Sequence, residues 1–433
     1  MFMDNFVYIL GNKFEYDFLS AWIKYNRIKE GISQEALAHG ICSTSHLSYF
    51  ENGKKKLRSE LIEALLKKLK ITNITGTKDI GLIRQKFHIL MFQVESFDYE
   101  SSEITYNELC TLESLLRNSP YNIEFNIYSL MYNILVERKS YNELKVSINI
   151  LDKVYSSLNQ DLQYIYMLIT GRFIYEYMNQ TEGIRRLEKA CEIKETPWIN
   201  YRLGVAYCLN WQHLKGVIYL EKALNSYSLS GRYMNSLQCH SFLGSSYIFL
   251  KMYEQAEFHL TSVANGSDYF TIDKNIFTVY TNLAKLYLDM GKYDKCIEYC
   301  HLAMNPLNSW ETDKRWIKSA WHASEQPILG ACIYIEVHKK LNDGFNYKEI
   351  FDKFLTDAYK NSVYYNYVYC LYLSIFNFNE DIFYKEVTDI ILPFYSYKGY
   401  WDIHYKITLL LIKHLESNRK YKDANNLYRE LLS

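Results

Sequence analysis

Apolar residues recur at helical spacing along almost the whole chain, first in short blocks and later in long ones. Over residues 14–71 the blocks are short and Gly40 separates two of them. Ser33 and Ser43 stand directly before the second and third blocks, where a serine hydroxyl can accept the first free N–H groups of a helix. This pattern predicts a small domain of short helices within residues 1–72, with residues 14–71 as its core.

The second and third of these short helices differ in what they expose. Leu37 and Ala38 can face the core from the second helix, and Leu47 and Phe50 from the third, with Gly40 in the turn between them. Two short helices joined by a glycine turn are typical of a helix-turn-helix, whose second helix enters the major groove of DNA. The segment is therefore expected to bind double-stranded DNA.

The polar positions around this motif are the candidate DNA-binding residues. Side chains that reach base edges must be polar and short, and cations beside the groove must neutralise the phosphates. Gln34, at the start of the second helix, can hold a phosphate together with the backbone N–H groups there. The candidates are Gln34, Thr44, Ser45, His46, Ser48, Tyr49, Lys54, Lys55, Lys56 and Arg58.

Two blocks of this segment carry a resemblance to a known family. The letters SQEALA at residues 33–38 and LSYFENGK at residues 47–54 resemble the phage-repressor-like (XRE, Cro/C1-type) helix-turn-helix family. The resemblance implies phosphate contacts by Gln34 and by the lysine after ENG. It implies base reading by Thr44, Ser45, Ser48 and Tyr49. Proline is frequent after ENG in that family, whereas this chain has Lys-Lys-Lys-Leu-Arg, which should alter backbone contacts and leave the fold unchanged.

Two other interpretations of the segment stay open. The lysines are also compatible with a solvated charge run on an ordinary helical bundle. His39, Cys42 and His46 have a spacing compatible with zinc, but no fourth ligand stands nearby, and two of the three fall where the motif needs a turn and an exposed face. We therefore expect no metal and no cofactor.

From about residue 78 the apolar pattern repeats over a longer distance. Leu203, Leu243 and Leu283 stand 40 residues apart. A small residue follows each leucine directly, a tyrosine follows four residues later, and small or aliphatic residues follow at 13, 17 and 20. The tyrosines are Tyr207, Tyr247 and Tyr287, and the later positions are Gly216, Ala256, Cys296, Leu220, Leu260, Cys300, Ala223, Val263 and Ala303.

This spacing has a physical cause in the packing of paired helices. A leucine and a ring one turn apart fill the gap to the partner helix, and small residues let the two helices approach closely. The pattern resembles the tetratricopeptide repeat, with a period of about 40 instead of 34 residues. It predicts an all-α chain in which seven to nine helical pairs over residues 79–433 form a right-handed superhelix with a concave inner surface, a plain helical bundle being the alternative.

A helix-turn-helix followed by such repeats resembles the RRNPP family of peptide-responsive regulators of Gram-positive bacteria and their phages. The resemblance covers nearly the whole chain and implies a dimer, with a short signalling peptide in the concave groove that changes DNA affinity. Asparagine can bind an extended peptide backbone because it both donates and accepts, and a basic residue can meet a carboxylate. The candidates at inner-facing offsets are Arg202, Gln238, Ser241, Asn282 and Lys285, with Asn200 and Arg172 nearby.

Charge and cysteine content refine this picture. Lys+Arg and Asp+Glu are equal at 49 each, but ten basic and five acidic residues lie between Ser20 and Lys70, so only this end favours a polyanion. Nine cysteines lack a repeated spacing and no leader is evident, which indicates reduced thiols in the cytoplasm. Residues 361–379 carry no charge, but four asparagines favour a buried helix over a membrane span.

Known enzyme motifs are missing, since the chain has no GxSxG, P-loop, HExxH or CxxC. Cys296, Cys300 and His301 cluster, but the two cysteines fill packing positions of the repeat. We therefore expect no catalytic residues and no enzyme. The alternative function is a repeat scaffold that sequesters another protein, such as a response regulator or a phage factor, with DNA binding secondary.

Overall fold

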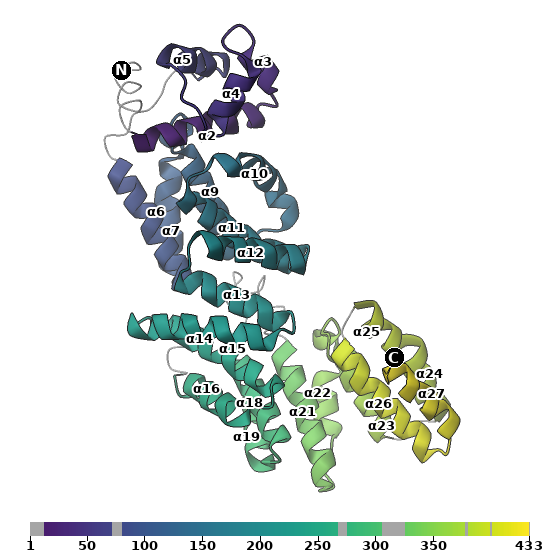
Figure 1. The fold of residues 1–433 in the computed structure, drawn as a ribbon. Coiled ribbons are helices and arrows are strands. Elements are labelled where there is room, and N and C mark those ends of the chain that lie inside the picture. Colours follow the sequence, from purple (N-terminus) through teal and green to yellow (C-terminus); the bar gives the residue numbers. More distant parts are fainter. Residues whose placement is uncertain are drawn as a thin grey trace. The chain divides into compact units, whose positions relative to one another are not determined.

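The computed structural model describes residues 13–71, 80–266, 275–304, 325–376, 380–398 and 401–432, and these residues form helices and turns without a β-strand (Figure 1). They divide into two compact units, Met1–Leu250 and Lys251–Ser433. The all-α prediction is confirmed. Two predictions concern residues outside the described ranges. The segment without an evident leader falls at residues 1–12, and the predicted domain boundary falls at residues 72–79.

The first unit begins with the predicted helix-turn-helix, composed of α2 (Lys13–Lys29), α3 (Gln34–Ala38), α4 (Thr44–Glu51) and α5 (Ser59–Lys68). Ser33 and Ser43 are the N-caps: their hydroxyls accept the backbone N–H groups of Ala36 and His46 at 3.0 and 3.2 Å. Gly40 makes the turn with φ of +78°, which a residue without a Cβ adopts readily. We refer to residues 13–71 as the head.

The rest of the first unit is an array of antiparallel helices. It comprises α6 (Ile80–Glu95), α7 (Tyr99–Thr111), α8 (Glu113–Arg117), α9 (Asn122–Leu135), α10 (Tyr141–Val154), the 3-10 turn η1 (Tyr155–Ser157), α11 (Gln160–Tyr177), α12 (Gln180–Ile193), α13 (Pro197–Leu209), α14 (His213–Leu229) and α15 (Tyr233–Phe249). Helices α11 with α12 and α13 with α14 pack closely as pairs.

The second unit continues with helices of the same kind. They are α16 (Tyr253–Asn265), α18 (Asn275–Asp289), α19 (Tyr293–Met304), α21 (Glu325–Leu341), α22 (Lys348–Phe354), η3 (Asp357–Tyr359), α23 (Tyr365–Ile375), α24 (Glu380–Glu386), the π-helical η4 (Val387–Ile391), α25 (Leu392–Lys398), α26 (Trp401–Ser417) and α27 (Tyr421–Leu432). The uncharged stretch supplies α23, and no described helix is long and apolar enough to cross a bilayer.

Small residues set the distance between paired helices, as the spacing predicts. A Cβ at Gly204 would lie 2.6 Å from Cγ of Leu220, and one at Gly183 would lie 2.5 Å from the backbone nitrogen of Tyr175. Leu203, whose side chain is fully buried, fills the space beside this contact. The pairs α11–α12 and α13–α14 are therefore held at separations that only glycine permits at these positions.

The repeated tyrosines do more than pack. The hydroxyls of Tyr207, Tyr247 and Tyr287 each donate to a glutamate on the preceding helix, namely Glu188 at 2.5 Å, Glu221 at 2.6 Å and Glu257 at 2.9 Å. Burial and the hydrogen bond to a glutamate carboxylate raise the pKa of each tyrosine, that of Tyr247 to about 12. The same bond recurs between Tyr367 and Glu336 at 2.7 Å, so tyrosine–glutamate bonds link several of the described helices to earlier ones.

Replacing Gly183 with alanine tests the close approach. The added methyl meets the backbone of α11, which cannot yield as a flexible side chain does, so Gly183→Ala should destabilise the protein by about 1–3 kcal/mol and lower its Tm. Gly81→Ala, on α6 with nothing within 4 Å of the new Cβ, is the matched control and should leave Tm unchanged or raise it. Equal effects of the two substitutions in calorimetry would contradict the packing role.

Candidate functional site

The candidate reading face of the head is the exposed side of α4 and the segment after it, and it is called the reading face below. Thr44, Ser45 and Tyr49 are exposed, the tyrosine to 54%, whereas His46 and Ser48 are half-buried. The cations that follow, Lys54, Lys55, Lys56 and Arg58, are all exposed. The structure therefore presents short polar side chains beside a row of positive charge, as base reading next to a phosphate backbone requires.

A buried ion pair fixes this face to the rest of the head. Both carboxylate oxygens of Glu51, which is fully buried at the end of α4, accept from Arg27 on α2, at 2.6 Å from Nε and 2.7 Å from Nη2. Arg27 also donates to the Ile32 carbonyl at 3.0 Å. Because such a bidentate pair is geometrically specific, Glu51 locks α2 to α4.

Glu51 also engages a residue predicted to touch DNA. The side-chain amide of Gln34 donates to Oε2 of Glu51 at 2.7 Å, which ties α3 to α4. In this arrangement the Gln34 side chain acts inside the head, and the phosphate contact predicted for this position would use backbone N–H groups. Sequence reasoning missed Glu51, although the ENG letters contained it.

In the array of the first unit, two of the predicted peptide-binding residues come together. Arg172 on α11 and Arg202 on α13 interact electrostatically. The Glu176 carboxylate pairs with Arg172 at 3.0 Å and raises its pKa against the opposing effect of burial. Arg202 is only 9% exposed, its Nε is buried without a hydrogen-bond partner, and burial followed by the charge of Arg172 lowers its pKa to about 10.

The two arginines therefore share one carboxylate. Among the described residues no acidic side chain forms an ion pair with Arg202, which contacts the Tyr201 ring at 5.4 Å instead. A buried cation without a counter-charge is costly, and an anion placed beside it would relieve that cost. The Arg172–Arg202 pair is thus a candidate anion site.

The turn between α6 and α7 lies against this pair. The Phe97 ring meets that of Tyr201 edge-on at 6.1 Å, and Tyr99 interacts electrostatically with both arginines. The buried Glu95 anchors the end of α6, because its carboxylate pairs with Arg232 at 2.7 Å and its backbone carbonyl accepts from Asn235 at 2.8 Å. These partners lie far apart in the sequence, and no local sequence pattern predicts that they meet.

A small cavity adjoins this anchor. It has a volume of about 270 Å³, and Met91, Glu95, Tyr164, Trp198 and Arg232 are among the residues that line it. The Trp198 Nε1 is buried without a partner. The cavity was not foreseen from the sequence, because its lining comes from four separate helices and the turn before α15.

The other predicted peptide-binding residues do not join the pair. Asn200 is buried on α13, two positions before Arg202 and hence on another side of the helix; it donates to Glu195 at 3.2 Å. Gln238, buried, and Ser241, half-buried, lie on α15. Asn282 and Lys285 belong to α18 of the second unit, where Lys285 pairs with Asp289 at 2.5 Å.

The two cysteine and histidine clusters considered from the sequence have ordinary structural settings. His39 is exposed after α3, while Cys42 and His46 are half-buried. Cys296 and Cys300 are fully buried on α19 at the predicted packing positions. Within the described ranges no three His, Cys, Asp or Glu side chains are arranged to hold a metal ion.

Comparison with known proteins bears on both halves of the chain. Residues 23–73 match the helix-turn-helix family model, and residues 277–304 match the tetratricopeptide repeat model. Over 427 residues the chain is 21% identical to the transcriptional activator NprA of Geobacillus stearothermophilus, which covers 91% of this chain and 97% of NprA.

Solved structures of the same fold extend over most of the chain. The apo form of the quorum sensor NprR from B. thuringiensis superposes with a TM-score of 0.66 at 18% identity, over 82% of this chain and 99% of NprR. NprR in complex with its cognate peptide NprX gives 0.50 at 15% identity, over 81% and 97%. A Rap protein complexed with Competence and Sporulation Factor gives 0.63 at 15% identity, again over 81% and 97%.

The fold and the site define an all-helical protein in which an XRE-type helix-turn-helix precedes tetratricopeptide repeats. Along nearly the whole chain it is similar in sequence to the transcriptional activator NprA, and it shares the fold of the quorum sensor NprR, which agrees with the predicted resemblance to the RRNPP regulators.

Replacing Arg202 with methionine tests its lack of a counter-charge. Arg202→Met removes a buried, unpaired cation and keeps an apolar stem, so it should stabilise the ligand-free protein by about 1–4 kcal/mol and raise its Tm. Arg172→Met is the matched comparison, and it should not stabilise because it leaves Glu176 without its partner. A fall in Tm for Arg202→Met as large as that for Arg172→Met would show that Arg202 is compensated.

Proposed function

We propose that this chain is a sequence-specific, DNA-binding transcriptional regulator that a short peptide controls. It acts as a homodimer, because one small helix-turn-helix contacts few bases and two half-sites raise specificity. The observation that carries the proposal is the exposed reading face of α4 with four cations directly after it, on the same chain as a repeat array with an unsatisfied anion site. No enzymatic activity is part of the proposal.

The relatives support the two halves of this proposal. NprA is a transcriptional activator, and NprR is a quorum sensor that was solved with its cognate peptide. In this chain the Arg172–Arg202 pair would take a carboxylate of the peptide, either its C-terminus or an acidic side chain. Binding there supplies the counter-charge that Arg202 lacks. Peptide binding would therefore stabilise the arrangement in which Arg202 is buried, and that arrangement would in turn bind the peptide more tightly.

The proposal is tested by an electrophoretic shift on the region upstream of the chain's own gene, with and without synthetic fragments of small peptides encoded next to it. A specific shift that one fragment strengthens or weakens is the expected result. The fragment should have no effect on Arg202→Met, while DNA binding by that variant without peptide should persist. Absence of any specific shift from the wild-type protein would refute the regulator.

Substitutions on the reading face should separate base reading from general affinity. Ser45→Ala and Tyr49→Ala should each change the preference among bases at one position of the site by about 1–3 kcal/mol, because their exposed polar groups would lie against base edges in the complex with DNA. Competition binding against single-base variants of the site measures this. Equal weakening on every sequence would remove these residues from the base-reading set.

The cations should behave differently. Lys55→Ala should weaken binding on all sequences alike and reduce the slope of log K against log salt concentration by about one, the effect of losing one phosphate contact. Fluorescence anisotropy at several salt concentrations measures the slope. An unchanged slope would contradict a phosphate contact by Lys55.

The second candidate function is a repeat scaffold that binds another protein, and the fold shared with a Rap protein is the observation that favours it. Replacing Lys54, Lys55 and Lys56 together discriminates the two. Loss of all regulatory activity in the cell supports the DNA-binding regulator, whereas full retention supports a scaffold that sequesters another protein.

A further inference from the structure

Helix α2 of the head packs against α9 and α10 of the array, and a buried lysine of α2 adds polar contacts beside this packing. Lys24 of α2 is 7% exposed, and its ammonium donates to Oδ1 of Asn52 at 2.9 Å and to the hydroxyls of Ser157 and Ser156 at 2.9 and 3.3 Å. The Ser156 hydroxyl also donates to Asn52 Oδ1 at 3.3 Å. Asn52 caps the end of α4, where its amide donates to the Ser48 carbonyl at 2.9 Å. We call Lys24, Asn52, Ser156 and Ser157 the seat.

The seat is specific in its geometry. An ammonium has three donors and no acceptor, and here three neutral oxygens from two distant parts of the chain take them. Burial lowers the pKa of Lys24, with the nearby Glu51 opposing that effect. Rotation of the head away from η1 would leave Lys24 with one of its three partners. This is costly, because a buried charge that loses its hydrogen bonds is destabilising.

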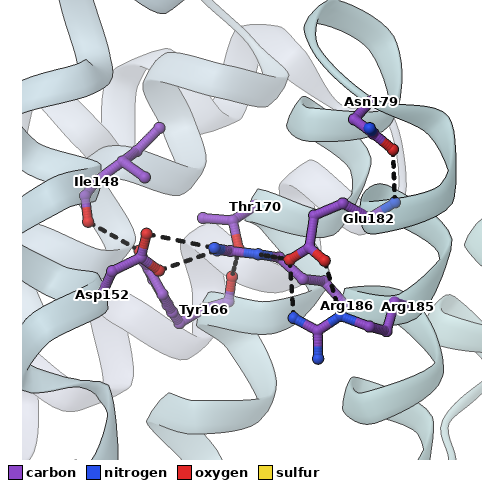
Figure 2. Close-up of polar contacts among 8 residues, drawn as sticks. All are labelled: Ile148, Asp152, Tyr166, Thr170, Asn179, Glu182, Arg185 and Arg186. Atoms are coloured by element: carbon purple, nitrogen blue, oxygen red, sulfur yellow. Dashed lines mark hydrogen bonds and ion pairs between the residues drawn. The ribbon is translucent and has the colours of Figure 1, made fainter.

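The array side of the seat is held rigidly. Figure 2 shows the contacts around Asp152, in the last turn of α10 just before η1. Its carboxylate accepts from Arg186 of α12 at 3.0 and 3.3 Å and from the Tyr166 hydroxyl of α11 at 2.9 Å. Arg186 also donates to Thr170 and Glu182, each at 3.1 Å. Three array helices therefore fix the point from which Ser156 and Ser157 project.

The seat leaves the reading face uncovered. Thr44, Ser45 and Tyr49 are exposed in the structure in which Asn52, at the other end of the same helix, is bound to Lys24 and Ser156. The contact therefore sets the direction in which α4 points and does not block it. In a dimer, the directions and positions of the two heads determine the spacing of half-sites that both can reach.

We propose that the seat makes Lys24, Asn52, Ser156 and Ser157 positioning residues, which fix the orientation of the head on the array and thereby the half-site spacing that the dimer selects. The inference rests on the proposed function as a dimeric DNA-binding regulator. A head held on the array only by the chain and by the packing of α2 on α9 and α10 would accept more spacings with similar affinity than a seated head does.

The test removes the two hydroxyls on the array side, Ser156→Ala with Ser157→Ala. The control is Ser228→Ala with Ser230→Ala, whose hydrogen bonds stay within α14 and α15. An operator is first recovered from random DNA with the wild-type full chain. Affinities are then measured for that operator, for duplexes with a half-site spacing changed in single base-pair steps, and for one half-site alone.

We expect the seat variant to bind the single half-site as the wild type does, because no base-reading residue has changed. Its preference for the best spacing over a spacing shifted by about half a helical turn should fall by about fivefold or more. The control variant should keep the wild-type preference. Lys24→Met should show the same loss of preference, and circular dichroism checks that it is folded.

A spacing preference unchanged in both the Ser156→Ala/Ser157→Ala and the Lys24→Met proteins would overturn the inference. A parallel loss on the single half-site and on every spacing would also overturn it, because that pattern indicates damage to the head itself. Failure of the wild-type protein to select any operator would instead refute the proposed function, so the two failures are distinct.

Discussion

The close approach of helices across glycine is the constraint on which the repeat array depends. Where Gly183 and Gly204 bring two backbones together, the pair buries its leucines completely, and the pair becomes a fixed unit. The tyrosine–glutamate bonds then connect one helical pair to the next, since the hydroxyl of Tyr207 donates to Glu188 and that of Tyr247 donates to Glu221. The high tyrosine content, 42 residues, thus has a polar as well as an apolar explanation.

Two buried arginines show how the protein distributes charge between structure and function. Arg27 is fully matched by both oxygens of Glu51, and the pair holds three helices of the head in one arrangement. Arg202 is buried to a similar degree but forms no ion pair among the described residues; aromatic rings and Arg172 surround it, and Glu176, which pairs with Arg172, acts on it only through its charge. The first pair gives conformational specificity. Arg202, in contrast, lacks a paired carboxylate, and an anionic ligand would supply one.

Much of the fold follows from local sequence, and much of the site does not. The serine caps of α3 and α4, the Gly40 turn and the leucine–tyrosine spacing of the repeats depend on residues within a few turns of each other, so their pattern predicts them. Contacts between residues far apart in the sequence produce no such local pattern. Lys24 and Ser157 are 133 residues apart, and Asn235 and Glu95 are 140 apart. Helical offsets locate a face only approximately, so Asn200 enters the candidates as a neighbour of Arg202, although a distance of two positions puts it on a different side of α13.

One helix belongs to both the anion site and the support of the seat. On α11, Arg172 lies beside Arg202, while Thr170 and Tyr166 take part in the network around Asp152 and Arg186 that precedes η1. A ligand that binds every arrangement of α11 equally well would fill the anion site and leave the head unmoved. A peptide that changes DNA selection must therefore bind more tightly to one arrangement of α11, and its differential affinity limits how far the head can shift. The contacts that position the head thus set the energetic scale on which a signalling peptide has to act.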